Sequence, residues 1–184
     1  MALSYLDLDL GEFLELVARR APAPGGGSVA AMTVAMAAGL VAMTARFSAD
    51  ADGDNRVAEQ VDGWRHRAAR LAEQDAEVYQ QVIDNYSSSG DDPARRTEQI
   101  RHALEAACEV PLEIAGIGAD VARQASALAV HGNRTTRGDA TTALLLAEAA
   151  VRSAARLVAI NVEAGGCDPD LVRRAQLCVD SLVG

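Results

Sequence analysis

Residues 25–45 read GGGSVAAMTVAMAAGLVAMTA, and this stretch decides the fold class. No charged residue lies between Arg20 and Arg46, so we expect a helix that is buried on all sides. Its length would also suit a membrane span, but it consists mainly of Ala, Gly, Thr and Met rather than Leu, Ile and Phe. Small side chains let neighbouring helices approach closely. We therefore expect a central, Gly/Ala-rich helix of a bundle, and no membrane.

The composition of the whole chain is typical of one helical domain. The 184 residues are 49% apolar and only 3% aromatic, so we expect a single domain spanning residues 1–184. All 17 basic residues are arginine, which excludes a Schiff-base lysine and a phosphate-loop lysine. The net charge of −9 and the absence of a basic cluster argue against a nucleic-acid partner. The acidic start lacks the basic region of a signal peptide, so we expect a cytoplasmic protein.

Apolar residues spaced three and four apart predict helices along most of the chain. Asp9 and Glu12 form a capping-box pattern at the start of the first helix, and Gly132 is a typical helix stop. Pro111 should divide a long segment into two helices at an angle. We expect an all-α, single-domain bundle of six or seven helices, with helical segments near residues 9–20, 25–45, 56–87, 92–131, 138–161 and 168–182.

Asp75 interrupts an apolar seam between Leu71 and Val78, so its carboxyl should point into the bundle. Burial raises the pKa of a carboxyl and suits it to proton exchange near neutral pH. Tyr79, four residues later, is placed to hydrogen-bond to the same ligand or to the acid. The alternative is a buried Asp that pairs with an Arg or a backbone amide and only fixes the helix register.

Gly25, Gly26, Gly27 and Ser28 open the apolar helix. The free amides of a first helical turn, at the positive end of the helix dipole, suit the binding of an anionic group. The alternative is that the glycines only permit a sharp turn into a crowded core.

Three further polar residues are candidates for a binding site. Asp139 stands at a predicted helix start, where an acid is ordinarily a cap, and Asn133 follows a glycine, where it suits a turn. Asn161 lies on an apolar seam, where the alternative is a role in core register. The three His and three Cys residues form no local ligand motif, so we expect no metal and no tightly bound cofactor.

Several segments occur in the order of a known family. Residues 22–31, PAPGGGSVAA, resemble the P-x-P-G-G-G-S-x-A-A signature of the cyclodeaminase/cyclohydrolase family, which includes formiminotransferase-cyclodeaminase and bacterial methenyltetrahydrofolate cyclohydrolases. Residues 71–79 are similar to its L-x-x-x-D-x-x-x-Y/F segment, and residues 106–112 to its A-x-x-x-V-P-L segment. Residues 132–140 resemble its segment from G-N to S-D-A, and Asn161 matches a later asparagine.

The resemblance implies a formiminotransferase-cyclodeaminase-like helical homodimer with a folate site near the subunit interface. That site would use the glycine run and the helices that carry Asp75, Asn133 and Asp139. A tetrahydrofolate derivative would be the substrate, either of a cyclohydrolase or of a cyclodeaminase. Asp75 would act as general acid and base, and Asp139 would assist it or orient the pterin.

The resemblance also implies how the rest of the folate would be held. The amides of Gly26, Gly27 and Ser28 would bind an anionic or carbonyl portion. Glutamate carboxylates need cationic partners, and Arg134 and Arg137 are the arginines nearest to the motif.

Two readings without catalysis remain open. One is a helical dimer of the same family that binds a folate-like or other small anionic ligand without turnover. It is favoured by residues 87–92, SSSGDD, where folate-active members often carry L-P-K. The other is a purely structural helical partner.

Overall fold

The computed structural model describes residues 4–49, 55–87 and 93–182. These ranges contain no strand, which confirms the all-α prediction. Within them lie six α-helices and one short 3-10 helix: α1 (Leu10–Ala18), α2 (Gly26–Ser48), α3 (Arg56–Ser87), α4 (Pro93–His131), η1 (Arg134–Thr136), α5 (Arg137–Gly165) and α6 (Asp170–Asp180).

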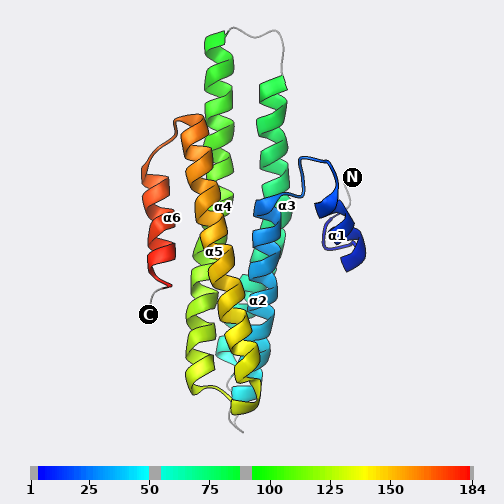
Figure 1. Ribbon diagram of the computed structural model, residues 1–184, viewed down its shortest axis with the longest axis vertical. Helices are drawn as coiled ribbons and strands as arrows, with labels where there is room; N and C mark the ends of the chain where they lie inside the picture. Colours follow the sequence, from blue (N-terminus) through cyan, green and yellow to red (C-terminus); the bar gives the residue numbers. More distant parts are fainter. Residues whose placement is uncertain (1–3, 50–54, 88–92, 183–184) are drawn as a thin grey trace.

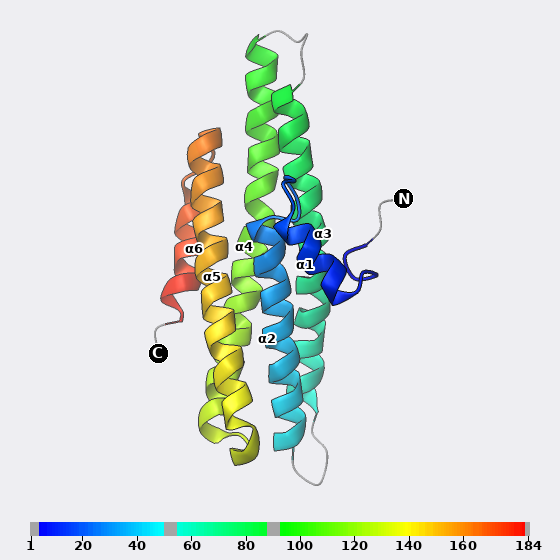
Figure 2. The same cartoon turned by 45° about the vertical axis from the view of Figure 1, so that its right-hand side comes forward.

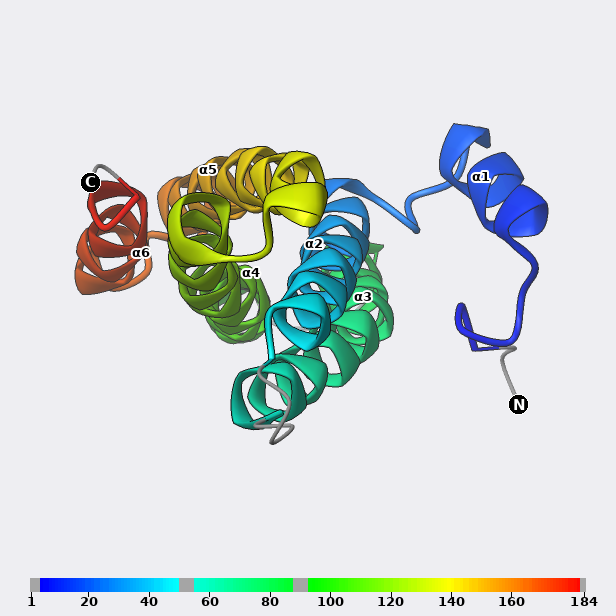
Figure 3. The ribbon, with the colours of Figure 1, turned by 90° about the horizontal axis from the view of Figure 1, so that it is seen from below.

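The four long helices α2 to α5 run side by side and form an elongated bundle (Figures 1 and 2). Helix α2 contacts α3, α4 and α5, and α4 has its most extensive contact with α5. Helix α6 packs on α5 and α4 at one side of the bundle, whereas α1 lies at the other side, beyond α2 (Figure 3).

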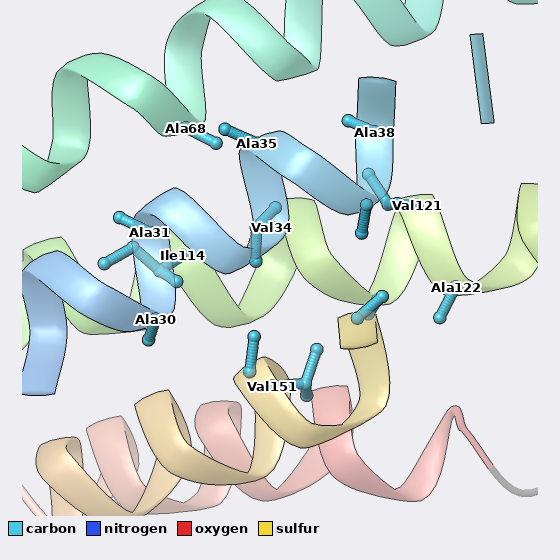
Figure 4. Close-up of a cluster of buried hydrophobic side chains, with 14 of the residues drawn as sticks. Ala30, Ala31, Val34, Ala35, Ala38, Ala68, Ile114, Val121, Ala122 and Val151 are labelled. Carbon is cyan, nitrogen blue, oxygen red and sulfur yellow. The ribbon is translucent and has the colours of Figure 1, made fainter. Parts of the chain in front are cut away.

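Small side chains of α2 let the long helices approach closely. Figure 4 shows Ala31, Val34 and Ala38 of α2 in the buried cluster, together with side chains of α3, α4 and α5. A Cβ atom on Gly118 of α4 would lie 2.6 Å from the Val151 side chain of α5, so this contact also requires a residue without a side chain. The core is therefore built from Ala, Gly and Val rather than from aromatic residues.

Helix α2 is not buried on all sides, and that prediction was wrong. Val29 is 38% exposed and Met36 57% exposed, because α3, α4 and α5 leave one face of α2 uncovered. By length and composition alone α2 could cross a membrane, yet 61% of its most apolar stretch is buried inside the structure. Core helices of globular proteins meet the same length and composition criteria.

The predicted division of residues 92–131 at Pro111 was also wrong, because α4 continues through the proline. Proline lacks the N–H that would bind the carbonyl four residues earlier. That carbonyl, on Ala107, instead accepts a hydrogen bond of 2.9 Å from Asn161 Nδ2 of α5. A side chain from another helix therefore replaces the missing donor.

Two predicted helix ends are confirmed. Asp9 caps α1, since its carboxyl accepts from the Glu12 amide at 2.8 Å and the Glu12 carboxyl accepts from the Asp9 amide at 3.0 Å. Helix α4 ends at His131, and the Gly132 amide donates back to the Leu128 carbonyl.

The start of α5 differs from its prediction. Asn133 accepts a hydrogen bond from the Thr135 amide and begins η1, which leads directly into a helix that starts at Arg137. Thr136 occupies the N-cap, so Asp139 lies inside the first turn instead of capping it.

Candidate functional site

The carboxyl of Asp75 lies against the first turn of α2. Ser28 Oγ is 3.0 Å from Asp75 Oδ2 and 2.9 Å from the backbone carbonyl oxygen of Ala72, and the Ser28 side chain is completely buried. Among the described residues, no arginine forms an ion pair with Asp75. Of the predicted alternative, the pairing with an arginine is therefore not what the structure contains, whereas the pairing with a backbone amide is, because the Ser28 backbone donates to the Asp75 carboxyl.

Gly27 provides the space that this carboxyl occupies. A Cβ atom on Gly27 would lie 1.9 Å from Asp75 Oδ1, far inside van der Waals contact. By contrast, the nearest atom to a Cβ on Gly26 is 4.0 Å away, on Leu157. At Gly27, therefore, the glycine is needed for the close approach of the acid.

A cavity of about 280 Å³ adjoins the acid. Helices α3, α4 and α5 and the segment leading into α2 all contribute to its wall. Its size is near the lower limit of small-molecule sites. The sequence-predicted site residues that line it are Gly25, Gly26, Gly27, Asp75, Tyr79 and Asn161.

Burial raises the pKa of Asp75 above its ordinary value of 3.8, while hydrogen bonds from the Ser28 side chain and backbone oppose that rise. The net direction is upward because desolvation penalises the ionised form of a carboxyl. An acid with a raised pKa in a cavity wall is suited to gain and lose a proton.

Tyr5 interacts with the acid at a distance, and sequence analysis did not indicate it. Burial and the negative charges of Asp75 and Glu73 raise the pKa of its phenol, although Tyr5 does not line the cavity. Its ring packs edge-on against Phe13, with centroids 5.7 Å apart. Tyr5 precedes the first helix, so no periodic pattern could have indicated it.

The remaining predicted residues lie at the other end of α2. Asn133 Nδ2 donates to the Phe47 carbonyl at 2.8 Å, and the Asn133 amide donates to Ser48 Oγ at 2.8 Å. Twenty helical residues separate Gly27 from Phe47, which at 1.5 Å per residue is roughly 30 Å.

Three charged residues share this distant end. Asp139 is half-buried, while Arg134 and Arg137 are exposed. One chain alone therefore does not bring Asn133, Arg134, Arg137 and Asp139 together with Asp75.

The part of the chain that the structure describes has no group of three His, Cys, Asp or Glu side chains able to hold a metal ion. What it does have is a half-buried acid, which lies against a glycine-rich helix start and lines a small cavity. These features define a helical-bundle protein with a half-buried acid beside a cavity near the size of small-molecule sites.

Comparison with known proteins identifies the family. Residues 9–176 match the family model described as formiminotransferase-cyclodeaminase. The chain is 32% identical over 161 residues to a methenyltetrahydrofolate cyclohydrolase from Methylorubrum extorquens, over 82% of this chain and 77% of that protein. The chain belongs to the formiminotransferase-cyclodeaminase family, as its motifs predicted.

Two other relatives support the same assignment. The chain is 30% identical over 174 residues to a formimidoyltransferase-cyclodeaminase from Sus scrofa, covering 87% of this chain but only 31% of that longer protein. The crystal structure of a formiminotetrahydrofolate cyclodeaminase from Thermotoga maritima superposes with a TM-score of 0.83 at 27% identity. That match covers 95% of this chain and 90% of the other.

Proposed function

We propose that this protein is an enzyme of one-carbon tetrahydrofolate metabolism. It either hydrolyses 5,10-methenyltetrahydrofolate or cyclises 5-formiminotetrahydrofolate with release of ammonia. The observation that carries the proposal is the Asp75 carboxyl, which is half-buried and lines a cavity without a cationic partner among the described residues. The activities named for the similar proteins support it.

Both reactions need proton transfer at one carbon between two nitrogens. In the hydrolysis, water adds to the methenyl carbon, loses a proton, and one C–N bond breaks as the departing nitrogen gains a proton. In the cyclisation, N10 attacks the formimino carbon and loses its proton, and the bond from that carbon to the formimino nitrogen breaks as this nitrogen takes up a proton and leaves as ammonia. Asp75 would accept the first proton and deliver the second, which is the role of a general base and acid.

The other cavity residues would position the reacting end of the folate. Gly25, Gly26 and Gly27 line the cavity at the positive end of the α2 dipole, which favours a carbonyl or an anion. Tyr79 is 47% exposed and would place its phenol near the cavity mouth. The side-chain oxygen of Asn161 would act as an acceptor, since its Nδ2 already donates to Ala107.

A homodimer is part of the proposal. We define the apolar face as the exposed or half-exposed side chains Leu6, Leu10, Leu14, Val17, Val29 and Met36 of the N-terminal segment, α1 and α2. An apolar surface of this kind is typical of a protein interface. If two copies pair through it with their α2 helices antiparallel, the partner's α5 start lies near the glycine-rich end. That arrangement would supply Arg134, Arg137 and Asp139 to a folate bound beside Asp75.

The test follows the loss of 5,10-methenyltetrahydrofolate by absorbance, with and without ammonia. We expect the wild type to accelerate the loss and Asp75→Asn to slow it by about 100-fold to 10,000-fold. Acceleration only with ammonia would identify the reverse of cyclodeamination. The control is Asp84→Asn, an exposed carboxyl on the same helix. Equal rates for the wild type and Asp75→Asn would contradict the proposal.

The alternative is a family member that binds the folate without turnover. It is favoured by residues 87–92, of which only Ser87 is described, because they lack the L-P-K that often follows the Tyr in folate-active members. Calorimetry would then detect binding of 5,10-methenyltetrahydrofolate, while the absorbance assay would find no acceleration in either condition.

A further inference from the structure

The Ser28 hydroxyl has one proton and two neighbours that can accept it. Its oxygen lies 2.9 Å from the Ala72 carbonyl oxygen and 3.0 Å from Asp75 Oδ2, and both distances are within hydrogen-bond range. A backbone carbonyl only accepts, and an ionised carboxylate also only accepts. With one proton in each hydrogen bond, the two contacts are both hydrogen bonds when the Asp75 carboxyl carries a proton and donates it to Ser28 Oγ.

We propose that Ser28 is a positioning residue that turns its hydroxyl between the Ala72 carbonyl and the Asp75 carboxyl as that carboxyl gains and loses its proton. When Asp75 is ionised, Ser28 donates to Oδ2. When Oδ2 carries the proton, it donates to Ser28 Oγ, and Ser28 donates to Ala72. The acid thus exchanges a proton without moving and without leaving a buried polar atom unpaired.

Because the Ser28 hydroxyl is buried, it needs a hydrogen-bonding partner in both protonation states of Asp75. Ser28 has no exposed surface, so water cannot replace a lost partner, and an unpaired buried hydroxyl is costly. The Ala72 carbonyl belongs to the continuous helix α3 and keeps its place in either state. The other carboxyl oxygen, Oδ1, occupies the space that a side chain at Gly27 would fill, and both residues line the cavity.

Few other ionisable groups surround this pair. Tyr5 of the N-terminal segment is close enough to interact electrostatically with Asp75, and Glu73 lies beside Tyr5 and accepts from Ser4 Oγ. Tyr79 of α3 lines the same cavity. The wall residues from α4 and α5 are Pro, Leu, Ile and Asn, which do not titrate. Ser28 thus forms the hydrogen bonds to the acid among the described residues.

The inference deepens the proposed function, because it concerns the acid assigned there, and its test does not depend on turnover. The experiment titrates ¹³C-labelled aspartate carboxyls by NMR and assigns the Asp75 signal by its loss in Asp75→Asn. We expect Ser28→Ala to move the Asp75 midpoint upward by about one pH unit, because an ionised carboxylate gains more from a donor than a neutral acid does. Ser28→Cys keeps a side chain of similar size and a weak donor, so its Asp75 midpoint should lie between those of wild type and Ser28→Ala.

Thr44→Val is the matched control. Thr44 is a second buried hydroxyl on α2, which donates to the Val41 carbonyl at 2.9 Å and is near the far end of the helix. The Thr44→Val variant should have a lower free energy of unfolding but an unchanged Asp75 titration midpoint. An unchanged midpoint in folded Ser28→Ala and Ser28→Cys would overturn the inference. A shifted midpoint in a protein without folate turnover would uphold the inference and overturn only the proposed enzyme activity.

Discussion

Asn161 of α5 supplies the hydrogen bond that Pro111 removes from α4. Its Nδ2 donates to the Ala107 carbonyl at 2.9 Å, and Ala107 is the residue whose carbonyl a non-proline residue at position 111 would bind. Both Pro111 and Asn161 also line the cavity next to Asp75. One contact therefore keeps a 39-residue helix continuous and fixes a polar side chain in the site.

The first prediction concerns this contact. Asn161→Leu leaves the buried Ala107 carbonyl without a donor and should lower the free energy of unfolding by about 1–3 kcal/mol. Pro111→Ala restores the backbone N–H, so Asn161→Leu should cost clearly less in that background. Urea denaturation of the four proteins of this cycle measures the coupling. Equal costs of Asn161→Leu in both backgrounds would show that the two residues are independent.

The second prediction concerns the glycine beneath the acid. In Gly27→Ala the new Cβ would overlap Asp75 Oδ1, so the carboxyl must move, and we expect folate turnover to fall about 100-fold. Gly26→Ala is the matched control, because its Cβ would meet only Leu157 at 4.0 Å. Steady-state rates of both variants check this. Similar activity in the two alanine variants would argue against a tight carboxyl position.

The third prediction is a pH dependence of stability. Because the pKa of Asp75 is raised on folding, the native state holds this proton at pH values where the unfolded state has lost it. Stability contributed by the proton is present below the ordinary value of 3.8 and is lost as the pH rises through the folded pKa. Asn does not titrate, so the Asp75→Asn variant does not lose this stability as the pH rises. Its free energy of unfolding relative to wild type should therefore increase with pH above about 4.

Urea denaturation curves of wild type and Asp75→Asn, recorded at about one-unit steps between pH 4.5 and pH 8, measure the difference between their free energies of unfolding. Asp84→Asn, at an exposed position of the same helix, controls for the loss of one negative charge. A stability difference between wild type and Asp75→Asn that stays constant with pH would contradict the raised pKa.

The fourth prediction concerns the apolar face. Met36 lies in it and is 57% exposed, so Met36→Arg should place a charge in the proposed interface and prevent pairing. Light scattering on a gel-filtration column should give twice 19.2 kDa for wild type and 19.2 kDa for the variant. Leu177→Arg, an equally exposed apolar position on α6 at the opposite side, should remain a dimer. A monomeric wild type would refute the dimer.

Local patterns accounted for much of the fold. The capping box at Asp9, the stop at Gly132 and the inward direction of Asp75 each depend on residues within about one or two turns, so spacing alone indicated them. The continuity of α4 did not follow from spacing, because the donor that compensates for Pro111 lies 50 positions later at Asn161.

The sequence by itself determined that the chain is helical, that small residues pack its core, and that one acid interrupts an apolar seam. These properties follow from periodicity and side-chain size, which act over a few residues. Only the tertiary structure decided which face of α2 stays open, that Ser28 and Gly27 hold Asp75, and that Asp139 lies at the far end. Those contacts and separations involve residues that are tens of positions apart in the sequence. The distances between them in space depend on how the helices pack, which spacing within one helix does not determine.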